Sequence, residues 1–116
     1  MYPSQLEFLR HILDECHFLL KVTAGKSRAE IVNDETLSKA IIRSLEIIGE
    51  ATKRTDENLK IRYPLVDWKE MAGMRDRLIH DYFGVDYDIV YNTIKNDIPN
   101  LHLELQRIIL IEEKGK

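Results

Sequence analysis

The chain has little of what tight turns, disulfides and membrane spans require. Its 116 residues include one Cys, three Pro and five Gly, whereas Gly and Pro together average about 12% of residues in proteins. So few turn residues argue against an all-β fold. The single cysteine, Cys16, excludes an internal disulfide and a cysteine-based zinc site. No apolar run approaches the roughly 20 residues that a membrane span needs, and the N-terminus is charged where a signal peptide is apolar, so we expect a cytoplasmic protein.

Positive charge is also in short supply. The 17 Lys and Arg against 20 Asp and Glu give a formal net charge of −3, which argues against a protein that binds nucleic acid over a generally basic surface. A local basic site is compatible with this balance. Hydrophobic residues make up 44% and charged residues 32%, a globular composition. The length predicts one domain over residues 1–116, with a core thin enough that association would help.

Apolar residues recur at helical spacing and predict an all-α fold. The expected helices span residues 4–25, 34–51, 68–83 and 86–109, with a short extra helix within 55–62. Residues 25–34 are expected to be a connection. Gly49, inside the second helix, predicts a close approach by another backbone. Pro99 predicts a kink or restart of the last helix near residues 97–99. Together these elements predict an antiparallel bundle of four main helices.

The third predicted helix carries the residues of greatest interest. Its apolar stripe follows positions i, i+3, i+4 and i+7 from Trp68 to Tyr82, and position 75 lies in the middle of this stripe. Position 75 is an arginine. A guanidinium within a buried stripe is costly unless an anion pairs with it. Arg75 therefore marks either a structural ion pair, which this pattern alone favours, or a place where an anion binds.

His80 adds a proton-exchanging group to the same helix. In the last turn before Gly84 the helix dipole favours a cationic imidazole, and Asp76 lies four residues earlier. An arginine, this histidine and the hydroxyl of Tyr82 suit metal-free RNA cleavage, in which the 2′-OH attacks the adjacent phosphate. On one ideal helix Arg75 and His80 lie roughly 140° apart, so two copies meeting across a dimer would most simply bring both to one phosphate.

At these residues the sequence resembles a known family. The spacing of Arg75, His80 and Tyr82 is the signature of HepT-like toxins in the HEPN superfamily of helical ribonucleases, and the flanking segments GEATKR and DYFGVD extend the likeness over about residues 44–86. The resemblance implies a bundle that forms a homodimer, with a metal-independent endoribonuclease cleft built from Arg75 and His80 of both protomers and no cofactor. It also implies a type VII toxin–antitoxin system, in which a nucleotidyltransferase of the MNT type neutralises the toxin by transferring AMP to Tyr82.

Other polar residues have plainer interpretations. We interpret Cys16 as a buried thiol and the neighbouring histidines as surface groups, in preference to a metal site, and His102 stands alone. The pair Glu46 and Glu50 lacks the Glu-x-x-His repeat of a di-iron centre. A basic cluster before the third helix either guides RNA toward the cleft or forms a solvated face, which is the commoner case; it consists of Lys53, Arg54, Lys60 and Arg62. Tyr82 and Tyr63 are candidates for stacking on RNA bases.

The prediction is thus an all-α homodimeric ribonuclease. Arg75 stabilises the charged transition state, His80 transfers protons, Asp76 orients His80, and Tyr82 assists RNA binding and accepts AMP. One alternative is a non-catalytic helical module that binds a nucleotidyltransferase subunit and uses Arg75 only to hold that partner. Another is a structural salt-bridge network, in which loss of Arg75 would lower stability by several kcal/mol without any activity to lose.

Overall fold

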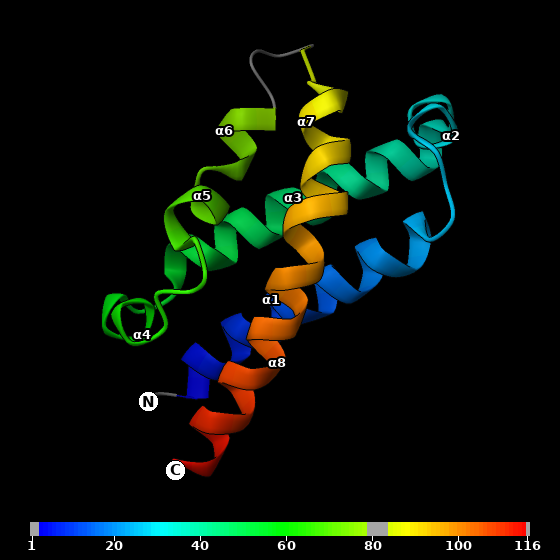
Figure 1. The fold of residues 1–116 in the computed structure, drawn as a ribbon. Helices are drawn as coiled ribbons and strands as arrows, with labels where there is room; N and C mark the ends of the chain where they lie inside the picture. Colours follow the sequence, from blue (N-terminus) through cyan, green and yellow to red (C-terminus); the bar gives the residue numbers. More distant parts are fainter. Residues whose placement is uncertain (1–2, 79–83, 116) are drawn as a thin grey trace.

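The computed structural model describes residues 3–78 and 84–115, and this part of the chain is mostly helical (Figure 1). Its elements are α1 (Pro3–Thr23), α2 (Arg28–Asn33), α3 (Glu35–Arg54), α4 (Glu57–Arg62), α5 (Trp68–Ala72), α6 (Met74–Leu78), α7 (Tyr87–Asn92), the π-helix η1 (Thr93–Asp97) and α8 (Ile98–Lys114). The all-α prediction is confirmed. No helix in these two ranges is both long and apolar enough to cross a membrane.

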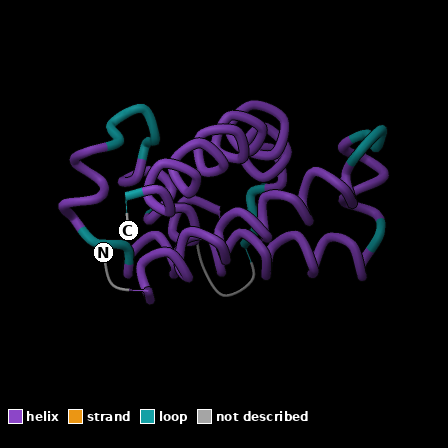
Figure 2. The backbone as a smooth tube through the Cα atoms, turned by 90° about the horizontal axis from the view of Figure 1, so that it is seen from below, coloured by secondary structure: helices purple, strands orange, loops and turns teal. Residues whose placement is uncertain are grey.

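Two long helices and one composite rod form the body of the molecule. Helices α1 and α3 pack side by side and run in opposite directions, and α7, η1 and α8 form a rod that crosses them (Figures 1 and 2). Helices α5 and α6 pack on the C-terminal half of α3. The core lies between these elements and includes fully buried side chains from α1, α3 and α8: Leu9, Ile12, Leu19, Ile41, Leu45, Ile48, Leu105 and Ile108.

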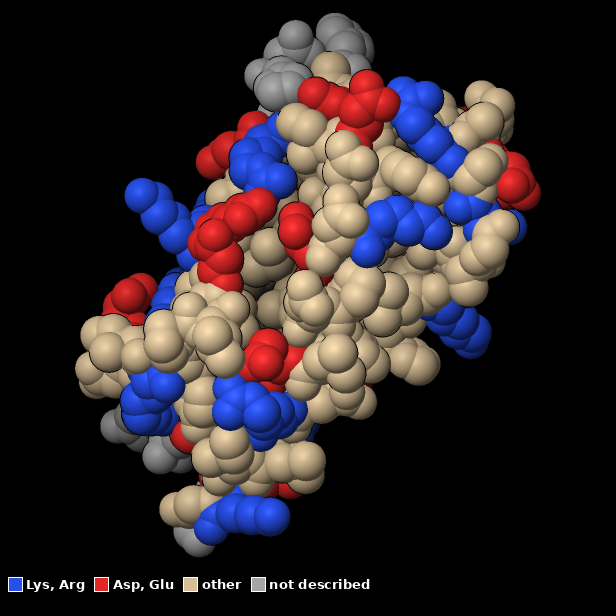
Figure 3. Space-filling view, viewed as in Figure 1, with Lys and Arg blue, Asp and Glu red and all other residues tan. Residues whose placement is uncertain are grey.

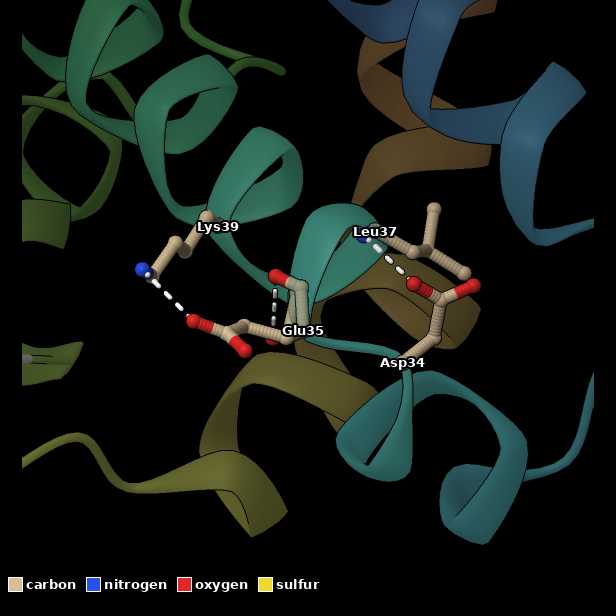
Figure 4. Close-up of polar contacts among 5 residues, drawn as sticks. Asp34, Glu35, Leu37 and Lys39 are labelled. Atoms are coloured by element: carbon tan, nitrogen blue, oxygen red, sulfur yellow. Dashed lines mark hydrogen bonds and ion pairs between the residues drawn. The ribbon is translucent and has the colours of Figure 1, made fainter.

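Aspartate caps begin three of the helices, at or next to the starts expected from the sequence at residues 34, 68 and 86. The carboxylate of Asp34 accepts from the backbone N–H of Leu37 at 3.0 Å, at the start of α3 (Figure 4). Asp67 caps α5 in the same way, and Asp86 caps α7. Such a carboxylate satisfies N–H groups that have no partner within the helix and interacts favourably with its dipole.

Helix α2 corrects the expectation that residues 25–34 form only a connection. The Ser27 hydroxyl accepts from the N–H of Glu30 at 3.2 Å, and the Glu30 carboxylate accepts from the N–H of Ser27 at 3.1 Å. This reciprocal capping box starts a helix of six residues whose Ile31 side chain is buried in the core. The S-x-x-E pattern is visible in the sequence, but the segment is too short for apolar periodicity to reveal a helix.

The last predicted helix is irregular just before the place where the sequence predicts a kink or restart. A π-helix, η1, occupies Thr93–Asp97, and Pro99 lies in the first turn of α8. The π-helix runs directly into α8, because the backbone N–H of Ile98 donates to the carbonyl oxygen of Thr93, and Pro99 has no N–H with which to continue this series of hydrogen bonds. The irregularity is the wider turn of η1 immediately before Pro99, and the apolar face continues through it with Ile94 and Ile98 both buried.

The cysteine and the histidines of α1 lie in different environments. Cys16 is buried, and burial raises the pKa of its thiol to about 12, so the thiol stays protonated at neutral pH. His11 and His17 are exposed. Within the described ranges, no three His, Cys, Asp or Glu side chains are placed to hold a metal ion. His102 is not isolated, however, since its ring stacks on that of His17 with centroids 6.1 Å apart.

Candidate active site

The segment expected to be one helix over residues 68–83 is interrupted at Gly73. Helix α5 ends at Ala72 and α6 begins at Met74, and Gly73 between them has φ −86° and ψ 5°, whereas an α-helical ψ is about −42°. Glycine is a weak helix former, which makes this change inexpensive. The predicted continuous helix is therefore wrong at this point.

Arg75 lies outside the buried stripe of α5 and α6. The buried side chains of the two short helices are Trp68, Met71, Met74 and Leu78. Met74 is 0% exposed, whereas the Arg75 side chain is 57% exposed. The expectation of a guanidinium embedded among apolar neighbours is thus wrong. Met74 occupies the core position, and Arg75 is available to a ligand from solution.

Helix α3 positions the junction that carries Arg75. A Cβ added at the buried Gly49 would lie 3.4 Å from the carbonyl oxygen of Met71, 3.6 Å from that of Ala72 and 3.9 Å from the backbone nitrogen of Arg75. The predicted close approach at Gly49 is confirmed. The absence of a side chain there lets the backbone of α5 and α6 rest directly on α3.

Glu46, one turn before Gly49, holds the Arg75 side chain. The Nε of Arg75 donates to Oε2 of Glu46 at 3.2 Å, and the Glu46 side chain is 29% exposed. This is an ion pair in contact with solvent and not a deeply buried salt-bridge network. A guanidinium has five N–H donors, and the hydrogen bond to Glu46 uses one of them. The other four can donate to the oxygens of a phosphate.

The remaining site residues fall in or next to a part of the chain that is not described. Asp76 follows Arg75 on α6 and is exposed. His80 and Tyr82 lie outside the described residues, so their roles stay predictions. The structure thus places Arg75 and Asp76 together on one short helix, five and four residues before His80 in the sequence.

A second ion pair, missed by sequence reasoning, joins the two short helices across Gly73. Arg77 Nη1 donates to Oε1 of Glu70 at 2.7 Å. A hydrogen bond with Asp67 and partial burial raise the pKa of Glu70, and the nearby Arg77 acts in the opposite direction. The pair ties α6 to α5 and so helps to fix the helix that carries Arg75. Its spacing of seven residues, two helical turns, was the available signal.

The predicted basic cluster separates into two parts. Arg62 pairs with Glu112 at 2.7 Å, and the Tyr63 hydroxyl donates to the same carboxylate at 2.5 Å. Tyr63 is 8% exposed, and burial together with the hydrogen bond to Glu112 raises its pKa. Its ring is therefore structural, and stacking on an RNA base is ruled out for it. Arg54 pairs with Glu50 at 3.4 Å, which leaves Lys53 and Lys60 of the cluster to consider.

These features define a class of protein: a small all-α domain that presents an accessible arginine, in a sequence motif that also contains a predicted proton-transfer histidine. A family model described as Ribonuclease HepT-like matches residues 12–108. The chain belongs to this HepT-like ribonuclease family, as the sequence resemblance predicted.

Relatives cover nearly the whole chain. A protein of Caldanaerobacter subterraneus subsp. tengcongensis, "Putative RNase TTE0752", is 46% identical over 91% of this chain and 95% of its own length. "Putative RNase MJ0125" of Methanocaldococcus jannaschii is 43% identical over 92% and 93%. "Probable ribonuclease HepT" of Thermococcus cleftensis is 37% identical over 93% and 98%. No solved structure matches the chain significantly.

Proposed function

We propose that the protein is a metal-independent endoribonuclease that acts as a homodimer and serves as the toxin of a type VII toxin–antitoxin system. Membership of the HepT-like ribonuclease family supports the activity, as do the names of the relatives. The observation that carries the proposal to particular atoms is the accessible Arg75 guanidinium on α6, which Glu46 of α3 holds through one nitrogen.

The proposed reaction is transesterification within RNA. His80 of one protomer removes the proton of a 2′-OH, and the 2′-oxygen attacks the adjacent phosphorus. The bond from phosphorus to the 5′-oxygen breaks as His80 of the partner subunit protonates that oxygen, giving a 2′,3′-cyclic phosphate and a free 5′-OH. Arg75 stabilises the added negative charge on the phosphoryl oxygens, and Asp76 orients the imidazole.

The direct test is incubation of the purified protein with a labelled RNA in excess EDTA. We expect cleavage that continues in the chelator and yields products ending in a cyclic phosphate, because side chains supply every charge and proton in the scheme. The variant His80→Ala should lose this cleavage. Light scattering should give the mass of a dimer. Cleavage that stops in EDTA and returns with a divalent metal would contradict the mechanism, and equal cleavage by His80→Ala would indicate a contaminating nuclease.

The proposal also assigns Tyr82 as the site of neutralisation. A nucleotidyltransferase of the MNT type would transfer AMP from ATP to the tyrosine oxygen and release pyrophosphate, which adds bulk and negative charge next to the cleft and repels RNA phosphate. Intact-mass measurement after incubation with such an enzyme and ATP should show addition of AMP. Tyr82→Phe should abolish the addition, whereas Tyr87→Phe, a nearby tyrosine control, should retain it. Labelling that persists in Tyr82→Phe would refute this assignment.

A further inference from the structure

A second basic feature lies beside Arg75 on the described surface. It is a groove of about 560 Å³ between the C-terminal end of α3, helix α4 and helix α5. Each of these helices contributes one lysine, and these are Lys53, Lys60 and Lys69. One carboxylate, Glu57, also lines it, and the apolar part of the lining comes from Ile61, Trp68 and Ala72. We call this feature the lysine groove.

The sign of charge sets the lysine groove apart from two other hollows of the surface. Among the described residues, one hollow is lined by four carboxylates and by no Lys or Arg; the four are Asp67, Glu70, Asp97 and Glu104. The other has one lysine against three carboxylates. Lys and Arg alternate with Asp and Glu over the face in Figure 3, so neither sign dominates it. With three lysines and one carboxylate, the lining of the groove is locally positive, although the chain as a whole has a net charge of −3. A groove concentrates the positive electrostatic potential of such a lining.

Two of the three ammonium groups are available to a ligand. The Nζ of Lys60 lies 3.3 Å from the Glu57 carboxylate. Lys53 and Lys69 are exposed, and no carboxylate in the described ranges pairs with either of them. An unpaired ammonium binds an incoming anion without first losing a protein partner. The basic cluster expected from sequence thus keeps two members here, Lys53 and Lys60, and gains Lys69.

The lysine groove continues from the Arg75 site along α3. Glu46, Gly49 and Lys53 are spaced at i, i+3 and i+7 and therefore share one face of α3. Glu46 holds Arg75, Gly49 contacts the α5–α6 junction, and Lys53 lines the groove. Seven residues correspond to about 10 Å along the helix axis. A polyanion held at Arg75 can therefore reach the groove within a few of its repeating units.

We propose that the lysine groove binds the phosphodiester backbone of single-stranded RNA next to the phosphate held at Arg75. The inference rests on the proposed function for its choice of polyanion. Ammonium groups contact phosphates without reading sequence, and the apolar rim at Ile61, which is 73% exposed, offers contact for sugars or bases. Charge on three helices next to an arginine fits a repeating anion better than a single small one.

The test is binding of an RNA strand whose 2′-hydroxyls are all methylated, because it keeps its phosphates but cannot be cleaved by 2′-OH attack. The groove variant is Lys53→Gln with Lys69→Gln. The matched control is Lys21→Gln with Lys95→Gln, which removes the same charge from two exposed lysines that do not line the groove and that pair with no carboxylate in the described ranges. Fluorescence anisotropy at several salt concentrations should show roughly tenfold weaker binding by the groove variant, and a slope of log K against log salt reduced by about 1.4, or about 0.7 per lost phosphate contact.

The outcomes separate the groove from the catalytic proposal. Equal binding by the groove variant and the unmodified protein overturns the inference, as does an equal loss in the control, which would indicate a general charge effect. Failure of the unmodified protein to bind at low salt overturns it as well. If the unmodified protein binds this strand and loses affinity in the groove variant, yet leaves ordinary RNA intact, the groove is supported and the proposed nuclease function fails.

Discussion

Replacing Arg75 with alanine should slow RNA cleavage by at least about 100-fold and change the free energy of unfolding by less than about 1 kcal/mol. The first expectation follows from the loss of the cation that faces charge developing on phosphorus. The second follows from the geometry of the pair with Glu46, because the Arg75 side chain is 57% exposed and water replaces it readily. Single-turnover cleavage and urea unfolding on the same preparations measure the two quantities.

Arg54→Ala is the matched control for this experiment. Arg54 is also an exposed arginine paired with a glutamate of α3, Glu50, but it lies outside the proposed site. Its removal should leave cleavage within about twofold of the unmodified protein, as expected for a surface position. A loss of several kcal/mol of unfolding free energy in Arg75→Ala would favour the structural salt-bridge alternative. Unimpaired cleavage by that variant would remove Arg75 from the catalytic centre.

The neighbouring substitution, Met74→Ala, should have the opposite profile and lower the free energy of unfolding by about 2–5 kcal/mol. Met74 is 0% exposed and fills the core beneath α6, so truncation leaves a cavity that its neighbours fill only in part. Urea unfolding at one fixed protein concentration measures the loss, since dimerisation would make stability depend on concentration.

Leu103→Ala serves as its control. Leu103 is 63% exposed on α8, so the same kind of truncation should cost less than about 1 kcal/mol there. Similar, small losses in Met74→Ala and Leu103→Ala would mean that Met74 is not a core residue. The packing of α6 with Met74 toward the core would then be wrong.

Local chemistry made most of the fold predictable. Asp34, Asp67 and Asp86 mark helix starts because a cap acts on backbone groups within three residues of itself. The close approach at Gly49 could be predicted because glycine is a poor helix former. A glycine inside an apolar helical pattern therefore indicates a close contact with another backbone. The break at Gly73 was not readable in this way. Counted from Met71, position 74 is i+3 and position 75 is i+4, and either spacing continues an apolar stripe. The sequence pattern therefore could not decide which of the two side chains is buried, and in the structure it is Met74, which packs in the core.

The candidate site was predicted in part. The motif identified Arg75, but its exposure and its bond to Glu46 depend on how α6 packs on α3. The partners of Arg62 and Tyr63 could not be anticipated, because both bind Glu112, which lies about fifty residues away in the sequence. Lys69 escaped notice for a related reason, since its place beside Lys53 exists only after α3 and α5 have packed.

Helix α5 separates two surfaces of opposite sign. Lys69 belongs to the lysine groove, while Asp67 and Glu70 border the hollow lined by carboxylates. On one flank of this five-residue helix an approaching nucleic acid strand would meet the unpaired ammonium of Lys69, and on the other it would meet carboxylates, two of which, Glu70 and Glu104, are already paired with Arg77 and Arg107. Attraction from the lysine flank would therefore favour one direction of entry before any base is contacted. Raising the ionic strength would weaken both the attraction that directs the strand and the affinity of the lysine groove for it, because exposed charges produce both effects.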